Sequence, residues 1–311
     1  MKKYLWGIVY GCLLTCFTGY VLLDTFVIPH AYATVPQESE SGSSDSGSSS
    51  NKPSNKPGNT SDKNNNEPVI SDRSYKDNNI SITITEHREY DTTIYVAEVI
   101  LSSPEYLQTA LAKNTYGRNV TQKTSEMATA NNAIFAVNGD YYGAREKGLV
   151  VRDGVIYRDS TSRDRENLVI YKDGTLDVVT ERDADPKSLV ENGALHILSF
   201  GPGLIVDGEL AVDRNDEVGQ AMASNPRTAI GMVDDLHYLF VVSDGRTDDS
   251  EGLSLYELAT FMKGLGAEIA YNLDGGGSAT MWFNGEIINV PISSKGLNKE
   301  RSVSDIVYIG Y

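Results

Sequence analysis

Four segments of the sequence join an apolar run to a polar, glycine-containing turn, and each carries side chains that could do chemistry. They are residues 136–142 (AVNGDYY), 225–229 (NPRTA), 242–246 (VSDGR) and 272–278 (NLDGGGS). Carboxylates at such strand ends serve as acids, bases or nucleophiles, and arginines bind anions. Each segment alone also fits a structural turn, because Asn-Gly and Asp-Gly are common hairpin turns. Together they predict a polar site at the ends of strands.

The last of these segments is the hardest to explain as a simple turn, since consecutive glycines cost backbone entropy and give up side-chain packing. The three glycines are Gly275, Gly276 and Gly277. Their amides could turn towards an anion and form a nest. Asp274 beside them would supply a carboxylate.

A serine hydrolase and a histidine-rich metal site are both poorly supported. Ser278 is a candidate nucleophile, but its segment lacks the final glycine of a nucleophile elbow. No histidine is an evident base, because the candidates are scattered through the chain: His87, His196 and His237. The same scattering argues against a zinc site. Without an EF-hand spacing we predict no metal or cofactor, and an oxygen-bound divalent cation such as calcium is left open.

Composition excludes further classes of function. The 311 residues include 27 Lys and Arg against 43 Asp and Glu, a net charge of -16, which would repel nucleic acid and anionic surfaces. Cys12 and Cys16 both lie in the apolar N-terminal segment. The rest of the chain therefore has no disulfide, no thiolate metal site and no catalytic cysteine.

The N-terminus predicts a membrane anchor. Lys2 and Lys3 precede an uncharged run over residues 4–23, and about 20 apolar residues suffice for a helix to cross a bilayer. The two lysines favour a single-pass protein in the cytoplasmic membrane, with its C-terminal domain outside. Ala31-Tyr32-Ala33 has the form of a cleavage site, so secretion after cleavage near Ala33 is the alternative. Either way, residues 34–311 are exported.

Three regions follow from these patterns: an anchor or signal segment at 1–33, a linker at 34–79 and a folded domain at 80–311. The linker consists mainly of Ser, Asn, Asp, Lys, Gly and Pro. Such a composition cannot bury enough apolar surface to fold, so we expect a disordered spacer that holds the domain away from the membrane.

Periodicity in the third region predicts many strands and few helices. Ile80, Ile82 and Ile84 alternate with Ser and Thr, as in a half-buried strand. Residues 254–257 (SLYE) form a capping box before a helix that ends at Gly264 or Gly266. Further strands are expected at 93–101, 133–137, 148–151, 155–157, 168–171, 176–180, 204–206, 229–233, 238–242 and 269–273. These elements predict a single α+β domain, rich in mixed or antiparallel sheet, with a few packed helices.

The motifs, in this order, resemble the phosphodiester glycosidase family. The resemblance covers residues 80–311 and rests on NGDYY at 138–142, NPRTAIG at 225–231, SDGR at 243–246 and NLDGGGSATM at 272–281. It extends to Gly148, to residues 152–154 and to residues 300–303. It implies hydrolysis of a sugar-phosphate diester. Bacterial relatives often have glycine at the position of Asp140, which is either a catalytic addition or a tolerated substitution.

The resemblance gives roles to the site residues. Expulsion of a phosphate monoester needs little general-acid help, so a cation for the phosphate and a carboxylate to activate water or attack the anomeric carbon suffice. Arg227, or else Arg246, would bind the phosphate; an ion pair is the structural alternative for Arg227. Asp274 would be base or nucleophile, with Asp244 as second carboxylate, although either could cap a turn. The expected substrate contacts are Asn138, Gly139, Tyr141, Thr228, Asn272, Gly275, Gly276, Gly277 and Ser278.

The predicted function is that of an exported glycoside hydrolase that cleaves a glycosyl phosphodiester in cell-envelope or extracellular glycopolymers. Its partners would be that glycan and, through the N-terminal helix, the cytoplasmic membrane. A non-catalytic carbohydrate-binding or exopolysaccharide-assembly module on the same scaffold is the alternative. Such a module would bind a glycan without turning it over.

Overall fold

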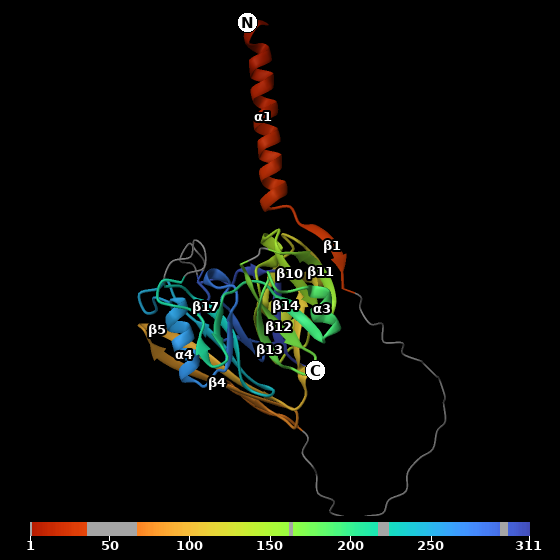
Figure 1. The fold of residues 1–311 in the computed structure, drawn as a ribbon. Helices are drawn as coiled ribbons and strands as arrows, with labels where there is room; N and C mark the ends of the chain where they lie inside the picture. The colour runs from red at the N-terminus through yellow and green to blue at the C-terminus, as the bar shows by residue number, and fades with distance from the viewer. Residues whose placement is uncertain (1, 36–66, 162–163, 217–223, 293–297) are drawn as a thin grey trace, which may run out of the picture.

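The computed structural model describes residues 2–35, 67–161, 164–216, 224–292 and 298–311. Helix α1 (Lys2–Phe26) projects from a sheet-rich body, and strand β1 (His30–Thr34) runs along that body (Figure 1). Within α1, Trp6–Phe26 has a mean hydropathy of 1.7 and is long and apolar enough to cross a membrane. Most of the predicted linker, residues 36–66, lies outside the described residues.

A sheet of nine strands forms the centre of the body, in the order β16-β15-β19-β17-β18-β5-β4-β3-β2. All of its pairings are antiparallel. Its strands are β2 (Val69–Ser71), β3 (Ser74–Lys76), β4 (Ile80–Glu89), β5 (Thr92–Leu101), β15 (Gly203–Val206), β16 (Glu209–Leu210), β17 (Arg227–Asp234), β18 (His237–Ser243) and β19 (Ile269–Asn272).

Two five-stranded sheets and two short ribbons complete the β structure, again with antiparallel pairs. One sheet, in the order β11-β10-β14-β12-β13, contains β10 (Gly148–Arg152), β11 (Val155–Ser160), β12 (Glu166–Tyr171), β13 (Leu176–Thr180) and β14 (Ala194–Leu198). The other, β21-β20-β9-β23-β6, contains β6 (Leu107–Leu111), β9 (Phe135–Asn138), β20 (Met281–Phe283), β21 (Glu286–Ile287) and β23 (Asp305–Ile309). In the ribbons, β1 pairs with β7 (Thr115–Arg118), and β8 (Gln122–Lys123) pairs with β22 (Ser302–Val303).

The body contains few helices, which confirms the predicted sheet-rich α+β class. The α-helices are α2 (Thr124–Ala130), α3 (Pro186–Glu191) and α4 (Leu255–Gly264). Four 3-10 turns are η1 (Pro104–Tyr106), η2 (Ala112–Asn114), η3 (Tyr142–Ala144) and η4 (Gly276–Ser278). The predicted capping box is present at α4, where the Ser254 hydroxyl accepts from the Glu257 amide and the Glu257 carboxylate accepts from the Ser254 amide.

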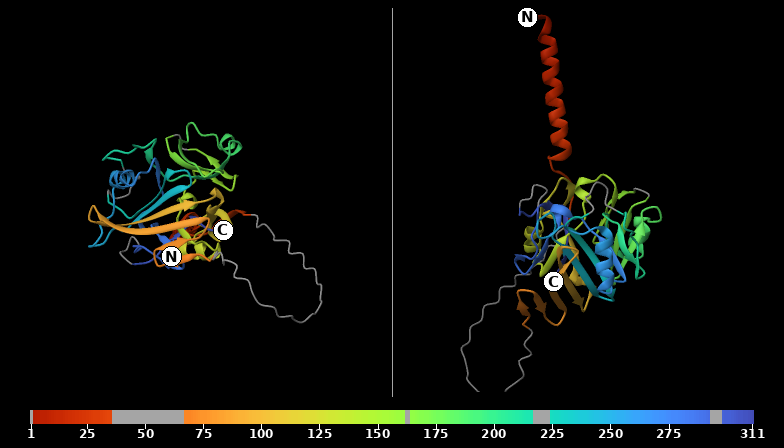
Figure 2. Two further views of the ribbon diagram at one scale, coloured as in Figure 1. Left: turned by 90° about the horizontal axis from the view of Figure 1, so that it is seen from below. Right: turned by 90° about the vertical axis from the view of Figure 1, so that its left-hand side faces the viewer.

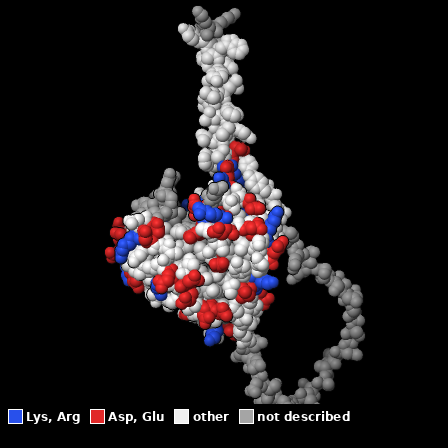
Figure 3. All heavy atoms as spheres, in the orientation of Figure 1, with Lys and Arg blue, Asp and Glu red and all other residues white. Residues whose placement is uncertain are grey.

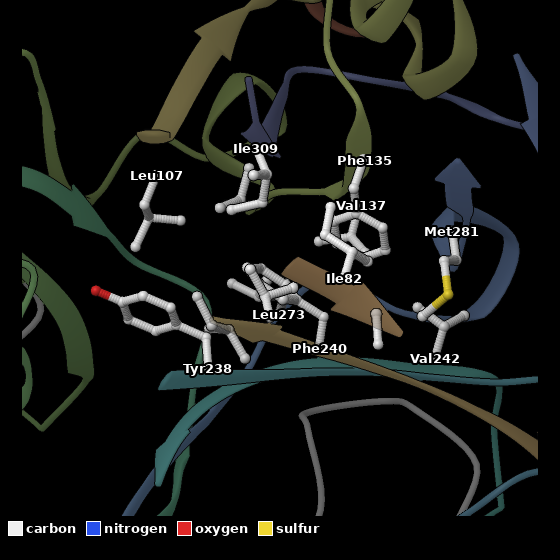
Figure 4. Packing of buried hydrophobic residues seen from close by; sticks show 14 of the residues in the cluster. Ile82, Leu107, Phe135, Val137, Tyr238, Phe240, Val242, Leu273, Met281 and Ile309 are labelled. Atoms are coloured by element: carbon white, nitrogen blue, oxygen red, sulfur yellow. The ribbon is translucent and has the colours of Figure 1, made fainter. Parts of the chain in front are cut away.

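The apolar side chains divide between the two faces of the nine-stranded sheet. Phe240 and Val242 of β18 pack against Phe135 and Val137 of β9, from the sheet that contains β23, and this inter-sheet core is drawn in Figure 4. The opposite face is covered by α4, seen beside β17 and β5 in Figure 1. Strand β5 contributes side chains to the cores on both faces of the sheet, because successive side chains of a strand point to opposite faces.

The structure differs from the predicted organisation in one boundary and in the effect of the spacer. The domain does not begin at residue 80, because β2 and β3 already pair onto the nine-stranded sheet through β4. The expected spacer effect also fails, since β1 pairs with β7 directly after α1 and holds the body at the end of that helix (Figure 2). The Asn119 side chain strengthens this contact by donating to the carbonyls of Thr25 and Ile28, both at 3.2 Å.

The surface agrees with the acidic composition. Asp and Glu side chains make up most of the charged area on the face drawn in Figure 3, while α1 shows almost none.

Candidate active site

Antiparallel pairing brings three of the four polar turns together at the same ends of three central strands of the nine-stranded sheet. Strand β17 begins at Arg227, and its neighbours β18 and β19 end beside that residue, at Ser243 and Asn272. The fourth turn follows β9 of the facing sheet. The predicted convergence of these segments at strand ends is therefore present in the fold.

Asn138 joins the sheet that contains β9 to the nine-stranded sheet at these strand ends. Its amide nitrogen donates to the Asp274 carbonyl at 2.6 Å, and its side-chain oxygen accepts from the Thr228 hydroxyl at 2.8 Å. Asn272 likewise donates to the Gly201 carbonyl at 2.8 Å. Asn138, Thr228 and Asn272 are fully buried and bonded to protein. In this structure the three side chains fix the strand ends, and the sugar contacts expected for them stay a prediction.

Asp274 lies at the base of two adjoining hollows, with 7% of its surface exposed. One carboxylate oxygen accepts from the Ser278 hydroxyl at 2.5 Å and from the Arg301 guanidinium at 2.8 Å. Its amide donates to the Gly139 carbonyl at 3.2 Å. Burial raises the pKa of Asp274 above that of an ordinary carboxyl, and the charge of Arg301 opposes this shift.

The first hollow, called the arginine pocket here, has a cavity volume of about 240 Å³. Besides Asp274 it is lined by the glycine-rich turn, by Tyr141 and by four arginines: Arg145, Arg227, Arg246 and Arg301. Among the described residues that line it, Asp274 is the only acidic one. In a chain with a net charge of -16, four arginines in one pocket favour an anionic ligand there.

Protein contacts hold several of these guanidinium groups in place. Arg227 Nε donates to the Leu253 carbonyl at 2.8 Å, and Arg246 Nη2 donates to the Asn225 side chain at 2.7 Å. Arg145 lies over the ring of Phe200, with 4.7 Å from its guanidinium carbon to the ring centre. Fixed donors of this kind bind an anion with little loss of side-chain entropy.

Close packing requires glycine at two positions of the glycine turn, and the anion nest stays a prediction for the remaining amides. A side chain at Gly275 would place its Cβ 2.6 Å from the Pro226 carbonyl oxygen. Gly276 has a φ of +59°, and its amide donates to that same carbonyl at 2.7 Å, so it is not available to an anion.

The second hollow, the serine pocket, has a volume of about 190 Å³ and shares Tyr141, Asp274 and Arg301 with the arginine pocket. Ser278, Ser302 and Ser304 line it, together with Asn119 from the contact with α1. No histidine lines either hollow in the described part of the chain. Ser278 therefore has no histidine base here, and its hydroxyl instead donates to Asp274.

Asp140 is placed away from both hollows, in a buried ion cluster. Its carboxylate accepts from the amides of Tyr142 and Ser199 at 2.8 and 2.9 Å, and lies 3.4 Å from Arg152 Nη2. Arg152 also pairs with Asp305 at 2.5 Å. A Cβ at Gly139 would lie 2.5 Å from Asp305 Oδ1, so Gly139 is required by packing. Neither Asp140 nor Gly139 lines the arginine or the serine pocket.

The ion cluster predicts a pH-dependent stability. Burial, and then the charge of Asp140, raise the pKa of Asp305 to about 8, so the folded chain binds a proton that the unfolded chain releases above about pH 4. This contribution to stability is full below about pH 4 and declines as the pH rises towards 8. The Asp305→Asn side chain cannot titrate, and the variant leaves the Asp140 carboxylate paired with the Arg152 guanidinium. Its melting temperature should therefore fall less than that of the wild type between pH 5 and pH 8, and parallel curves would contradict the assignment.

Asp244, the predicted second carboxylate, also lies outside the two hollows. It is buried, and one of its oxygens accepts from the Val290 amide at 2.8 Å and from Asn289 Nδ2 at 3.4 Å. Burial raises the pKa of Asp244. These bonds tie the end of β18 to residues 289–290, so within the described structure the carboxylate joins two distant segments and does not cap its own turn. Among the described residues, no group of three His, Cys, Asp or Glu side chains is placed to hold a metal ion.

Comparison with known proteins identifies the family of the chain. The phosphodiester glycosidase family model matches residues 131–310, more than half of the chain. The chain belongs to the phosphodiester glycosidase family. One relative is the uncharacterized protein YomE, derived from the SPbeta prophage of Bacillus subtilis. It is 29% identical over a match that covers 63% of this chain and 31% of YomE.

Animal relatives agree with the family assignment. The mouse N-acetylglucosamine-1-phosphodiester alpha-N-acetylglucosaminidase is 31% identical over 46% of this chain and 30% of its own length. The chain thus spans about a third of the length of these curated relatives. The solved catalytic domain of the zebrafish enzyme, auto-inhibited by its pro-peptide, has the same fold, with a TM-score of 0.59, 24% identity and coverage of 75% of this chain and 83% of that one.

The sequence did not assign roles to two arginines of the candidate site. Arg301 follows a stretch outside the described residues and reaches Asp274 from the start of β22. Arg145 follows η3 and lies 5.7 Å from the ring centre of Tyr141, while Arg301 lies 5.9 Å from it. Arg301 falls within the family resemblance at 300–303, which was the one signal for it.

Removing the Arg301 charge should shift the pH dependence of the reaction. Arg301 lowers the pKa of Asp274 against the effect of burial, so Arg301→Gln should raise that pKa further. If Asp274 acts in its ionised form, the acid limb of kcat/KM will move to higher pH, because kcat/KM reports the free enzyme. A pH titration of both proteins measures this. An unchanged acid limb would show that another group titrates there.

Proposed function

We propose that this chain hydrolyses a glycosyl phosphodiester in an exported or envelope glycopolymer. One observation carries the proposal: a single buried carboxylate, Asp274, shares a pocket with four arginines. Guanidinium groups match the oxygens of a phosphate, and a carboxylate beside them faces the sugar that the phosphate carries.

The chemistry of the leaving group fits this pocket. Cleavage at the anomeric carbon expels a phosphate monoester, which needs far less protonation than a sugar alkoxide. Two carboxylates are therefore not required, in contrast to most glycosidases. Asp274 activates water or attacks the anomeric carbon, while the arginines stabilise the charge that develops on the departing phosphate.

The remaining contacts position the sugar. Tyr141 is half exposed and lines both hollows, so its ring can stack on a pyranose. Ser278 and Arg301 orient the Asp274 carboxylate through their hydrogen bonds. Asn138 fixes the backbone beneath it, which keeps the carboxylate in register with the arginines.

The name of the mouse relative, an N-acetylglucosamine-1-phosphodiester alpha-N-acetylglucosaminidase, supports a sugar 1-phosphate diester as the class of bond. Helix α1 supports a site outside the cytoplasmic membrane, either on an anchored chain or on one released near Ala33. Teichoic-acid-like polymers, glycosyl-phosphate exopolysaccharides and sugar-phosphate-capped glycans contain such bonds outside the cell.

The test is release of reducing sugar by the full chain from a panel of sugar 1-phosphate methyl diesters. Hydrolysis that is abolished by Asp274→Asn supports the proposal. Binding of these diesters without any product favours the non-catalytic module. If the chain neither binds nor cleaves these diesters, the hydrolase and the binding module are both excluded.

A further inference from the structure

A third hollow adjoins the proposed catalytic site, and the reaction derived above does not use it. This tyrosine pocket, with a volume of about 290 Å³, is lined by Tyr32, Tyr116, Tyr142, Arg118, Arg145 and Arg158, among others. Arg145 also lines the arginine pocket, and Gly143 lines both the tyrosine and the serine pocket. The three hollows are therefore neighbours around one site.

The aromatic wall of this pocket is built by pairing β1 with β7. The ring of Tyr32 in β1 lies 5.9 Å from that of Tyr116 in β7, and Tyr116 stacks on Tyr142 at 5.4 Å. Tyr116 and Tyr142 are buried, whereas Tyr32 is 63% exposed. The segment that follows the membrane helix thus presents an exposed ring, held by buried ones, beside the proposed active site.

The polar wall of the pocket is basic. Arg158 is fixed by donating to the carbonyls of Gly148 and Tyr142 at 2.7 and 3.0 Å. Its Nη2 atom is buried and donates to no acceptor among the described residues. Arg118 adds a second guanidinium, paired at 3.4 Å with Glu146. Three arginines against one glutamate favour an anionic ligand in a chain that is otherwise strongly acidic.

An aromatic face beside fixed guanidinium groups suits one ligand chemistry: a sugar ring that carries a phosphate. The apolar face of a pyranose packs on an aromatic ring, and its phosphate accepts from arginine. A polymer of glycosyl phosphates repeats that chemistry at each unit. The unit next to the cleaved bond would lie in the neighbouring pocket.

We propose that the tyrosine pocket is a second subsite, which binds the adjacent glycosyl-phosphate unit of a polymeric substrate, and that β1 completes it through Tyr32. This inference rests on the proposed function. It makes the membrane-proximal strand part of the substrate site, so the chain should prefer a polymer to a small diester.

The experiment compares two probes of the same sugar: the methyl phosphodiester and a trimer of the glycosyl phosphate. In the full-length chain, Tyr32→Ala should lower kcat/KM for the trimer about tenfold and leave the methyl diester within about twofold, as expected for loss of an aromatic anchor. Tyr32→Trp should restore the trimer activity. Arg118→Gln should repeat the trimer-selective loss without removing the ring.

Tyr311→Ala is the matched control, because Tyr311 is 62% exposed and packs on Tyr106, outside the pocket. It should change neither probe. An equal loss on both probes in Tyr32→Ala, or no loss on the trimer, would overturn the subsite. An intact mass showing that the mature chain lacks residues 1–33 would overturn it as well, since Tyr32 would be gone.

Failure of the proposed function is distinguishable from failure of the subsite. If the wild type cleaves neither probe, the hydrolase proposal fails, and calorimetric titration of the trimer into the wild type tests the subsite alone. Binding that Tyr32→Ala weakens about tenfold supports the subsite. Absence of trimer binding by the wild type overturns it.

Discussion

Asp274→Asn should lower turnover of a glycosyl phosphodiester by ~100-fold or more, the low end for loss of a positioned acid or base. Asparagine keeps the size of the side chain and can still accept from Ser278 and Arg301. The fold should therefore survive, and a circular dichroism melt will check it. Initial rates of sugar release at saturating substrate measure the effect.

Asp244→Asn is the matched control for this variant. It removes the charge of another buried carboxylate at a strand end, one that bonds to Val290 and lies outside the two hollows. We expect it to retain most of the activity. Near-normal turnover in Asp274→Asn, or a comparable loss in Asp244→Asn, would remove Asp274 from its role as base or nucleophile.

Arg227→Lys should reduce kcat/KM for a phosphodiester by about 10- to 100-fold, because lysine keeps the charge but loses the planar fork. The interaction strengthens as charge develops on the departing phosphate, so kcat should fall as well as KM rise. An aryl glycoside of the same sugar has no phosphate to bind and should lose much less. Steady-state kinetics on both substrates separate the two effects.

A structural role for Arg227 predicts a different outcome. Its Nε donates to the Leu253 carbonyl, and loss of this bond would disturb the pocket for every substrate. Equal losses on the two substrates would therefore assign Arg227 to the structure and pass the phosphate to Arg246 or Arg301. Arg246→Lys provides the comparison, since Arg246 is exposed and its loss should not affect folding.

The sequence predicts those elements whose pattern is local. The alternation at Ile80, Ile82 and Ile84 becomes β4, and the capping box at Ser254 starts α4 with both expected hydrogen bonds. Strands β2 and β3 were missed because a strand of three residues is too short to show a hydrophobic period. Their place in the sheet depends on β4, which lies further along the chain.

The candidate site was predictable where a motif carried it and not where distant segments meet. Asp274 and Arg227 were found from their turns, and both line the arginine pocket. Asp140 also follows a strand in a polar turn, but it lies in a buried ion cluster with Arg152 and Asp305. Nothing in a linear sequence distinguishes a carboxylate that faces a pocket from one that pairs with an arginine on another strand.

The short connection between α1 and β1 limits the distance at which this chain can act. Helix α1 ends at Phe26 and β1 begins at His30, so the link spans at most about 14 Å when fully extended. Asn119, which bonds to the end of α1, also lines the serine pocket beside Asp274. If α1 stays in the bilayer, the proposed hydrolase would reach only bonds close to the membrane surface, and bonds further out in a polymer would remain uncut.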